Sequence, residues 1–272
     1  MKYLFFLYLT SHFLMAGEPQ GWRPVWKDEF NGSKLDYSKW AVEENGHGGG
    51  NQELQYYLDR KENVRVEGGN LILQAHRERV NVAGVVREYT SGRIRTKRRA
   101  AWKYGRFEIR ARLPQGQGVW PAFWLLPETT RYGGWAASGE IDIMEALGHE
   151  PDRVHDNIHF GGEWPNNKHS GATYRLPGKN IADDFHIYAY EWEPGEMRWY
   201  VDGHLYQTLN KWHSTAGAYP APFDQPFHLI INLAIGGKWP GSPDKNTVFP
   251  ATLYVDYIRV YQREKAVIEP TP

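Results

Sequence analysis

The stretch GEIDIMEALG places three acidic residues, Glu140, Asp142 and Glu145, within six positions of an otherwise apolar run. On a β-strand, side chains two positions apart point to the same face, so Glu140 and Asp142 project together while the isoleucines between them point into the core. Carboxyl groups held this close repel one another when ionised, so at least one of them keeps its proton near neutral pH. The stretch therefore has the groups needed for acid–base chemistry.

Strict alternation along this strand would turn Glu145 toward the core, where an ionised carboxylate is costly unless it is paired. One extra residue in the strand, a β-bulge at about Ile143–Met144, would return Glu145 to the face of the other two acids. The spacing E-x-D-x-x-E therefore predicts a bulge, and bulges are over-represented next to active sites.

The spacing also suggests a type of reaction. The Cα atoms of the two glutamates should lie roughly 13 Å apart along the strand. Side chains that lean together across a concave sheet would bring the carboxyl groups to about 5–6 Å, the separation found in retaining rather than inverting glycosidases. The spacing does not say which glutamate is the nucleophile. The alternative is an exposed acidic strand face bound by surface lysines and arginines.

Aromatic and histidine side chains flank the acids in the sequence. Trp120, Trp124 and Trp135 precede them, and His159 and Trp164 follow. Trp rings are common platforms for sugar faces, although a Trp is more often a core residue and a lone His is more often structural. The chain has 12 Trp, 17 Tyr and 11 Phe, more aromatic residues than a core requires. The Trp and His residues beside the acids favour a catalytic over a structural role for the three carboxyl groups.

The pattern between residues 21 and 262 predicts strands and turns in a single domain. Within residues 104–113, the eight residues 106–113 alternate strictly between charged and apolar, as a strand with one solvated face does. Residues 185–209 contain three β-rich runs separated by Pro-Gly and Asp-Gly turns. Residues 227–237 are nearly all apolar and predict a central strand covered on both faces, and residues 252–262 predict another strand. We therefore expect an all-β sandwich or jelly roll with little helix.

Charge and cysteine content exclude several classes of function. Lys plus Arg and Asp plus Glu each number 32, so the formal net charge is zero. This balance argues against a nucleic-acid surface and suits a neutral partner. The basic run RTKRRAAWK at residues 95–103 is the exception, and such a run is more often a solvated turn. The chain has no Cys, which excludes disulfides and thiolate chemistry.

The ends of the chain differ in composition from the rest. Residues 1–17 combine Lys2, an apolar run and small residues at their end, which predicts a secretory signal peptide; a buried strand or a membrane anchor is the alternative. Residues 263–272 are charged and then Pro-rich, and we expect them to be disordered. The mature protein should be secreted to the medium or periplasm, free of the membrane and monomeric.

The acidic stretch resembles the active-site signature of glycoside hydrolase family 16, in its laminarinase-like branch of endo-β-1,3-glucanases. Further segments resemble the same family and run in order along almost the whole mature chain. They are WKDEFNG (26–32), NQELQYY (51–57), SGRIRTK (91–97), GVWPAFWLLP (118–127), IHFGGEWPNN (158–167), FHIYAYEWEPGEMRWYVDG (185–203), NLAIGGKWPG (232–241) and VDYIRVYQ (255–262).

The resemblance implies a β-jelly roll of two bent antiparallel sheets, concanavalin A-like, with a concave substrate cleft. It implies that Glu140 is the nucleophile, that Glu145 is the acid/base, and that Asp142 hydrogen-bonds the nucleophile. It assigns substrate-binding positions to Glu53, Arg93, Trp120, Trp124, Trp135, His159 and Trp239. No cofactor is needed for the chemistry, but a structural Ca²⁺ is implied at Glu29, Gly69 and Asp256, where the alternative is ordinary surface acids.

The leading hypothesis is a secreted enzyme that cleaves internal β-1,3 bonds of laminarin-type β-glucans with retention. A second hypothesis is the same chemistry on mixed-linkage β-glucan or on a galactan; the neutral charge balance makes a sulfated polymer less suitable. A third, from another class, is a non-catalytic glucan-recognition module, whose members have lost the catalytic acids. Both glutamates are present here, which counts against the third hypothesis.

Overall fold

The computed structural model describes residues 19–264 of the 272-residue chain. Within this range the chain forms one ten-stranded and one eight-stranded sheet and a single short 3-10 helix, η1 (Gly48–Gly50), as expected for an all-β protein. No helix in the described range is long and apolar enough to cross a membrane. The expected signal peptide at residues 1–17 lies outside the described residues, as does all of the expected tail beyond residue 264.

The ten-stranded sheet forms the outer layer of the molecule. Every described pair within it is antiparallel except β3 with β6. In spatial order its strands are β16 (His204–Leu209), β15 (Glu196–Val201), β14 (His186–Glu193), β8 (Gly105–Arg112), β18 (Ala251–Arg263), β5 (Asn70–Val82), β6 (Val85–Ser91) and β3 (Gln55–Tyr57), with β1 (Trp22–Asp28) beside β18 and β4 (Val64–Glu67) beside β5. Arg263, the first residue of the expected tail, is the last residue of β18.

The eight-stranded sheet forms the inner layer, and all its described pairs are antiparallel. In spatial order its strands are β12 (Asn167–Ser170), β11 (Arg153–Gly161), β10 (Glu140–Glu145), β9 (Val119–Pro127), β17 (Phe227–Ile235), β7 (Arg93–Arg95) and β2 (Ala41–Val42), with β13 (Thr173–Arg175) also on β11. The expected active-site strand, β10, thus lies in the interior of this sheet.

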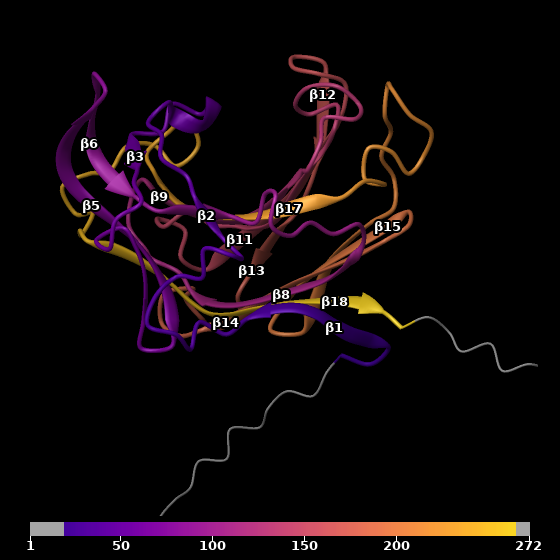
Figure 1. Ribbon diagram of the computed structural model, residues 1–272, viewed down its shortest axis with the longest axis horizontal. Coiled ribbons are helices and arrows are strands. Elements are labelled where there is room, and N and C mark those ends of the chain that lie inside the picture. Colours follow the sequence, from indigo (N-terminus) through magenta and orange to yellow (C-terminus); the bar gives the residue numbers. More distant parts are fainter. Residues whose placement is uncertain (1–18, 265–272) are drawn as a thin grey trace, which may run out of the picture.

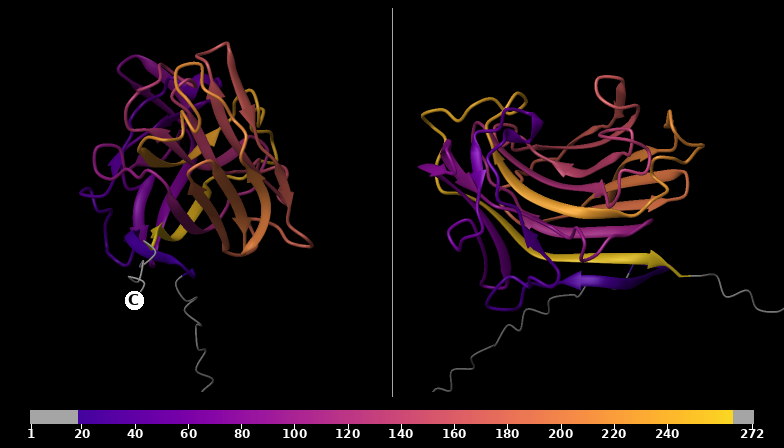
Figure 2. Two further views of the ribbon diagram at one scale, coloured as in Figure 1. Left: turned by 90° about the vertical axis from the view of Figure 1, so that its right-hand side faces the viewer. Right: turned by 45° about the horizontal axis from the view of Figure 1, so that its top comes forward.

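Figure 1 shows β8 and β18 in one layer and β17 in the layer above them. In the right-hand view of Figure 2 the orange strand β17 is visibly bent and lies over the yellow strand β18. β1 and β18 lie side by side and are paired, so the two ends of the described chain meet on the outer layer, away from β10.

The core fills the space between the two layers. In β8 the residues Phe107, Ile109 and Ala111 are fully buried, which confirms the alternation predicted for this strand. All of β17 is buried, and the strand pairs with β9 on one side and β7 on the other. It is therefore the central, doubly covered strand that its apolar sequence predicts.

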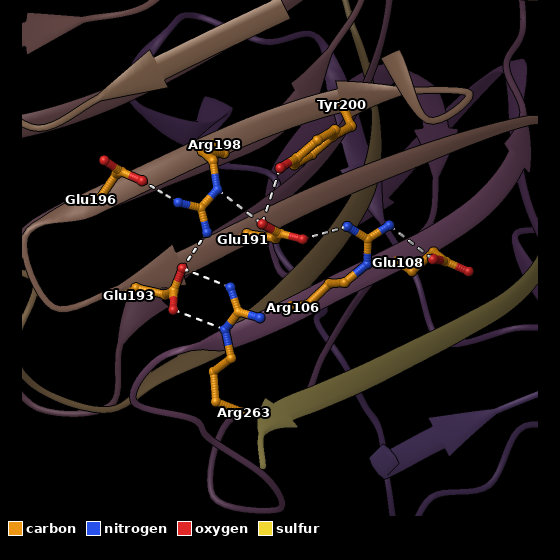
Figure 3. A network of polar contacts seen from close by, with 8 residues as sticks. All are labelled: Arg106, Glu108, Glu191, Glu193, Glu196, Arg198, Tyr200 and Arg263. Carbon is orange, nitrogen blue, oxygen red and sulfur yellow. Dashed lines mark hydrogen bonds and ion pairs between the residues drawn. The ribbon is translucent and has the colours of Figure 1, made fainter. Parts of the chain in front are cut away.

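An ion-pair network covers the outer face of the ten-stranded sheet (Figure 3). It joins residues of β8, β14, β15 and β18, namely Arg106, Glu108, Glu191, Glu193, Glu196, Arg198, Tyr200 and Arg263. Arg198 donates to Glu191 (Nε–Oε2 2.9 Å) and also pairs with Glu193 and Glu196. Burial would raise the pKa of Glu191, but the hydrogen bonds from Arg198, Arg106 and Tyr200 outweigh it and lower that pKa. The network ties four strands together on the solvent side.

Candidate active site

The acids lie on β10, between β9 and β11. The pairing of β10 with both neighbours shifts register between Asp142 and Glu145, which confirms the predicted bulge. Because of the extra residue, Ile143 and Met144 are both buried in the core at 2% and 1% exposure. Glu145 therefore returns to the face of Glu140 and Asp142, opposite the core.

Two neighbouring groups hold the bulged strand in place. The indole N–H of Trp199, a fully buried residue of β15, donates to the main-chain carbonyl oxygen of Asp142 (3.0 Å). Gly139, directly before Glu140, has a φ of +87°, and a Cβ there would lie 2.8 Å from the ring of Phe223. Only glycine fits this conformation and this space without a shift of its neighbours.

Each glutamate receives a hydrogen bond from a different tryptophan. Trp135 Nε1 donates to Glu140 Oε2 (2.7 Å), and Trp120 Nε1 donates to Glu145 Oε1 (3.0 Å). One oxygen of each carboxyl group is thus fixed by an indole, which orients the other oxygen. Both bonds favour the ionised form of the carboxyl group that accepts them.

Burial raises the pKa of all three acids. The pKa of Glu140 rises to about 7, because burial outweighs the hydrogen bond from Trp135 and the charge of Arg93. Burial and the charge of Glu140 raise the pKa of Glu145 to about 8 against the hydrogen bond from Trp120. Burial raises the pKa of Asp142 well above its usual value, helped by both glutamates. The site can therefore hold a protonated and an ionised carboxyl group side by side at neutral pH.

His159 lies beside two of the acids. Its Nε2 atom is 3.7 Å from Glu140 Oε1 and 3.6 Å from Asp142 Oδ2. Burial and the charge of His169 lower its pKa to about 4, so the imidazole is neutral at pH 7. His159 is thus a neutral polar neighbour of the acids rather than a cation paired with them.

Arg93 and Trp124 form one side of the site, on β7 and β9. The Arg93 guanidinium lies 4.8 Å from the Trp124 ring centroid and forms an ion pair with Glu43. Trp124 Nε1 donates to Asn232 Oδ1 (2.7 Å). Glu53 is only 8% exposed and accepts hydrogen bonds from neighbouring side chains, including Gln55 Nε2 (2.7 Å). Glu53 is therefore a buried residue that hydrogen-bonds to its protein neighbours on the Arg93 side of the site.

The expected tryptophan platforms differ in exposure. Trp135 and Trp239 are 43% and 42% exposed, so each presents ring surface to a ligand. Trp120 is only 8% exposed and packs edge-on against Trp239 (5.4 Å between centroids). Trp120 acts on Glu145 through its N–H rather than as a platform, and Trp135 and Trp239 are the better platforms.

A pocket of about 500 Å³ lies beside Glu145, and its lining includes His155, Asn157, His169 and Trp239. The histidines and the asparagine were missed by sequence reasoning. The alternation of polar residues in VHDNIHF could have indicated His155 and Asn157, because with His159 they occupy every second position of β11. His169 comes from β12, and only the pairing of β12 with β11 brings it here.

The expected calcium residues lie in or beside strands of the outer sheet. Arg259 donates two hydrogen bonds of 2.8 Å to the Glu29 carboxylate, and Arg110 Nη1 donates to Asp256 Oδ2 (2.6 Å). The positive charges of these two guanidinium groups would repel a cation bound at the same carboxylates. The side chains of Glu29 and Asp256, in these positions, therefore do not fit a calcium site. Calcium binding near Gly69 stays a prediction that depends on main-chain oxygens.

A different group of side chains has the spacing of metal ligands. Glu140, Asp142 and His159 each offer one possible ligand atom, and these three atoms lie within 4.8 Å of one another. This group could therefore hold a metal ion. These are the residues expected to contact substrate, and a cation there would occupy carboxyl oxygen atoms of Glu140 and Asp142.

Comparison with known proteins identifies the family. The model of the glycosyl hydrolases family 16 matches residues 37–259. A glucan endo-1,3-beta-glucosidase A1 of Niallia circulans is 45% identical over 261 residues, which are 90% of this chain and 38% of that protein. A beta-glucanase of Rhodothermus marinus is 49% identical over 250 residues, or 89% of this chain and 85% of that protein.

The fold agrees with the sequence comparison. The laminarinase catalytic domain of Thermotoga maritima superposes with a TM-score of 0.82 at 41% identity, over 90% of this chain and all of that one. The two-sheet sandwich is therefore the jelly roll that the sequence predicted. The protein is a laminarinase-like glycoside hydrolase that belongs to family 16.

Proposed function

We propose that this protein is a secreted endo-β-1,3-glucanase that cleaves laminarin-type glucans with retention of the anomeric configuration. The observation that carries this proposal is the bulged strand β10, which turns Glu140 and Glu145 to one face. Each of the two carboxyl groups there has its own indole donor and a raised pKa. The names of the relatives supply the choice of a β-1,3-glucan.

The first step forms a glycosyl-enzyme. The higher pKa of Glu145, about 8, keeps this group protonated at neutral pH, while Glu140, at about 7 and next to the Trp135 indole, supplies the carboxylate. A Glu140 oxygen attacks the anomeric carbon as the glycosidic C–O bond breaks, and the Glu145 proton passes to the leaving oxygen. Glu140 then forms an ester and Glu145 carries the negative charge.

The second step releases the sugar. Glu145, now ionised, removes a proton from a water molecule, whose oxygen bonds to the anomeric carbon while the ester bond to Glu140 breaks. Two inversions give net retention, and both carboxyl groups return to their starting states. Asp142 lies between the two, and the charges of both glutamates add to the effect of burial in raising its pKa, which favours its protonated form.

Product analysis tests the substrate and the stereochemistry. The panel is laminarin, curdlan, mixed-linkage β-glucan and agarose, with proton NMR of the first-formed reducing sugar. We expect β-1,3-oligosaccharides that appear first as the β-anomer. Greater activity on mixed-linkage glucan or agarose would favour the second hypothesis, and binding without cleavage would favour a recognition module. An α-anomer appearing first would mean inversion.

Azide rescue tests the role of each glutamate. In Glu140→Ala the anion fills the space of the lost nucleophile, so we expect activity to return with an α-glycosyl azide product. In Glu145→Ala we expect rescue only on activated aryl glycosides, which need no acid for departure, with a β-glycosyl azide product. The opposite pattern would exchange the two roles.

Export of the protein is part of the proposal and rests on Lys2 and the apolar run that follows it. The mature chain should begin near residue 17 or 18. N-terminal sequencing of material from the medium or periplasm measures this directly. An intact Met1 in the soluble cytoplasmic fraction would contradict export without affecting the proposed chemistry.

A further inference from the structure

The edge of the inner sheet is interrupted beside the active site. β12 ends at Ser170 and β13 begins at Thr173, yet both strands pair with β11 in one continuous register, with Ser170 opposite Ile158 and Thr173 opposite His155. The two residues between the strands therefore face β11 without forming regular ladder pairs. An edge strand in unbroken register needs a local cause for such an interruption.

The cause is the side chain of Asp156 on β11. The Asp156 N–H donates to the Ala172 carbonyl oxygen (3.1 Å), as in an ordinary antiparallel pair. The return bond is different, because the Ala172 N–H donates to the carboxylate atom Asp156 Oδ1 (3.3 Å). The carboxylate thus takes the place of a main-chain acceptor in the ladder.

The adjacent glycine shows how closely the two strands approach here. A Cβ on Gly171 would lie 2.1 Å from the main-chain oxygen of Asp156 and 2.9 Å from the Cα of Asn157. Contacts this short exclude any side chain at residue 171 unless the backbone moves. Gly171 and Ala172 therefore lie close against β11, and the strands before and after them, β12 and β13, are both paired with it.

Asp156 occupies an unfavourable place for a carboxyl group. Its side chain is 3% exposed and points between the sheets, like those of Val154 and Ile158 on the same strand. Burial raises its pKa to about 7 against the hydrogen bond from the Ala172 amide. Tyr190 and Tyr206 face it from β14 and β16, and its charge helps to raise the pKa values of Asp142 and Glu145, whose side chains lie on the opposite face of β10. An apolar residue would be buried on this interior face at a lower free-energy cost, so a carboxyl group at this position suggests a specific role.

The segment that Asp156 holds forms part of the pocket beside Glu145. Its wall is formed by the interrupted edge, from His169 through Thr173. Glu145 lines this pocket and Glu140 does not. Because the general acid must reach the leaving oxygen, the pocket lies on the leaving-group side of the cleaved bond.

We propose that Asp156 is a positioning residue that shapes the leaving-group pocket by withdrawing the Ala172 amide from the regular ladder. A regular ladder at this point would straighten the edge strand and change the wall that faces the departing sugar. The proposal rests on the proposed function, since it takes Glu145 as the acid.

Two substitutions separate the hydrogen bond from the charge. Asp156→Asn keeps an oxygen that can accept from Ala172, whereas Asp156→Val keeps the approximate size and loses the acceptor. We expect Asp156→Val to raise KM for a β-1,3-glucan at least fivefold. Its kcat/KM on an aryl β-laminaribioside, whose leaving group is no sugar, should stay within twofold. Asp156→Asn and the control Asp183→Asn, at an exposed acid, should match the wild type on both substrates.

Hydrogen–deuterium exchange of residues 167–175 gives a readout that does not need activity. We expect faster exchange in Asp156→Val and unchanged exchange in Asp156→Asn. If Asp156→Val does not fold, Gly171→Ala displaces the same backbone from the opposite side and should produce the same split between substrates. An equal loss on both substrates, an unchanged KM for glucan, or an Asp156→Asn variant as impaired as Asp156→Val would overturn the proposal. A wild-type protein inactive on β-1,3-glucan would instead refute the proposed function, and the exchange result would still decide whether Asp156 holds Ala172.

Discussion

At the scale of single residues, the chemistry depends on how two similar glutamates are made different. Both are on one strand and both have a pKa raised by burial. The charge of Arg93 lowers the pKa of Glu140, whereas the charge of Glu140 raises that of Glu145. Arg93 therefore favours ionisation of Glu140, which suits the proposed nucleophile, and Glu140 favours protonation of Glu145, which suits the proposed acid.

Trp120→Phe tests this balance, because it keeps an aromatic ring and removes the N–H that bonds to Glu145. That bond stabilises the carboxylate, so its loss should raise the pKa of Glu145 further. Since the acid must be protonated, we expect the alkaline limb of the kcat/KM profile to move up by about 0.5–1 pH unit, measured on laminarin.

Trp124→Phe is the matched control, since Trp124 donates to Asn232 and not to an acid. Its alkaline limb should coincide with that of the wild type. A Trp120→Phe profile that moved toward lower pH, or one that moved equally in both variants, would mean that Glu145 is not the group that titrates there.

At the scale of single elements, the bulge in β10 compensates for the extra residue between Asp142 and Glu145. Deletion of Met144 would leave the run E-x-D-x-E, in which strict alternation keeps Glu145 on the face of Glu140 and Asp142 without a bulge. We therefore expect the deletion variant to fold and to keep measurable activity. Met144→Leu, which keeps the strand length and the volume, should also stay folded and active. Thermal unfolding and laminarin hydrolysis measure both, and a deletion variant that is unfolded or inactive beside an active Met144→Leu would contradict this role of the bulge.

The outer network permits a second prediction at this scale. Arg198→Met leaves Glu191, Glu193 and Glu196 close together without their shared cation. The Arg198 side chain is 17% exposed, so we expect the free energy of unfolding at pH 7 to fall by about 1–3 kcal/mol. Arg175→Met, which breaks a pair whose arginine side chain is 68% exposed, should cost less than about 0.5 kcal/mol.

The sign of the pH dependence follows from the lowered pKa values of Glu191 and Glu193. A carboxyl group with a lowered pKa in the folded state stabilises the protein above its unfolded pKa, about 4.5, and loses this effect as the pH falls. The difference between wild type and Arg198→Met should therefore shrink between about pH 5 and pH 3. Urea unfolding at several pH values measures it, and a difference that grew on acidification would contradict the network's role.

Local sequence patterns predicted individual strands well. Features that depend on the pairing of distant segments could not be predicted from them. Alternation gave β8, the apolar run gave the doubly covered β17, and the phase of the acids gave the bulge in β10. The sequence does not indicate that β12 and β13 form one interrupted edge, or that Asp156 faces the core beneath them. These features depend on which strands become neighbours, and so does the engagement of Glu29 and Asp256 by arginines.

At the scale of the whole molecule, the charge balance bears on the kind of substrate. The net charge of the chain is zero, and Arg93 and Arg95 at one side of the site are both paired with Glu43. Charges already neutralised by a partner attract little additional anion, and long-range steering of a charged polymer would depend strongly on salt. A neutral glucan is the substrate that fits such a surface.

We therefore expect KM for laminarin to change by less than about twofold between about 20 mM and 0.5 M NaCl, because screening acts on exposed charges and the substrate has none. A carboxymethylated β-1,3-glucan is the control polymer, since it has the same linkage with added charge. If exposed cations such as those of residues 95–103 guided binding, this polymer would bind more tightly at low salt and lose that advantage at high salt. Tighter binding of the carboxymethylated polymer at low salt would show that the basic run takes part in substrate recognition. Equal KM values for this polymer at both salt concentrations would leave the shape of the site and the exposed rings of Trp135 and Trp239 as the source of affinity.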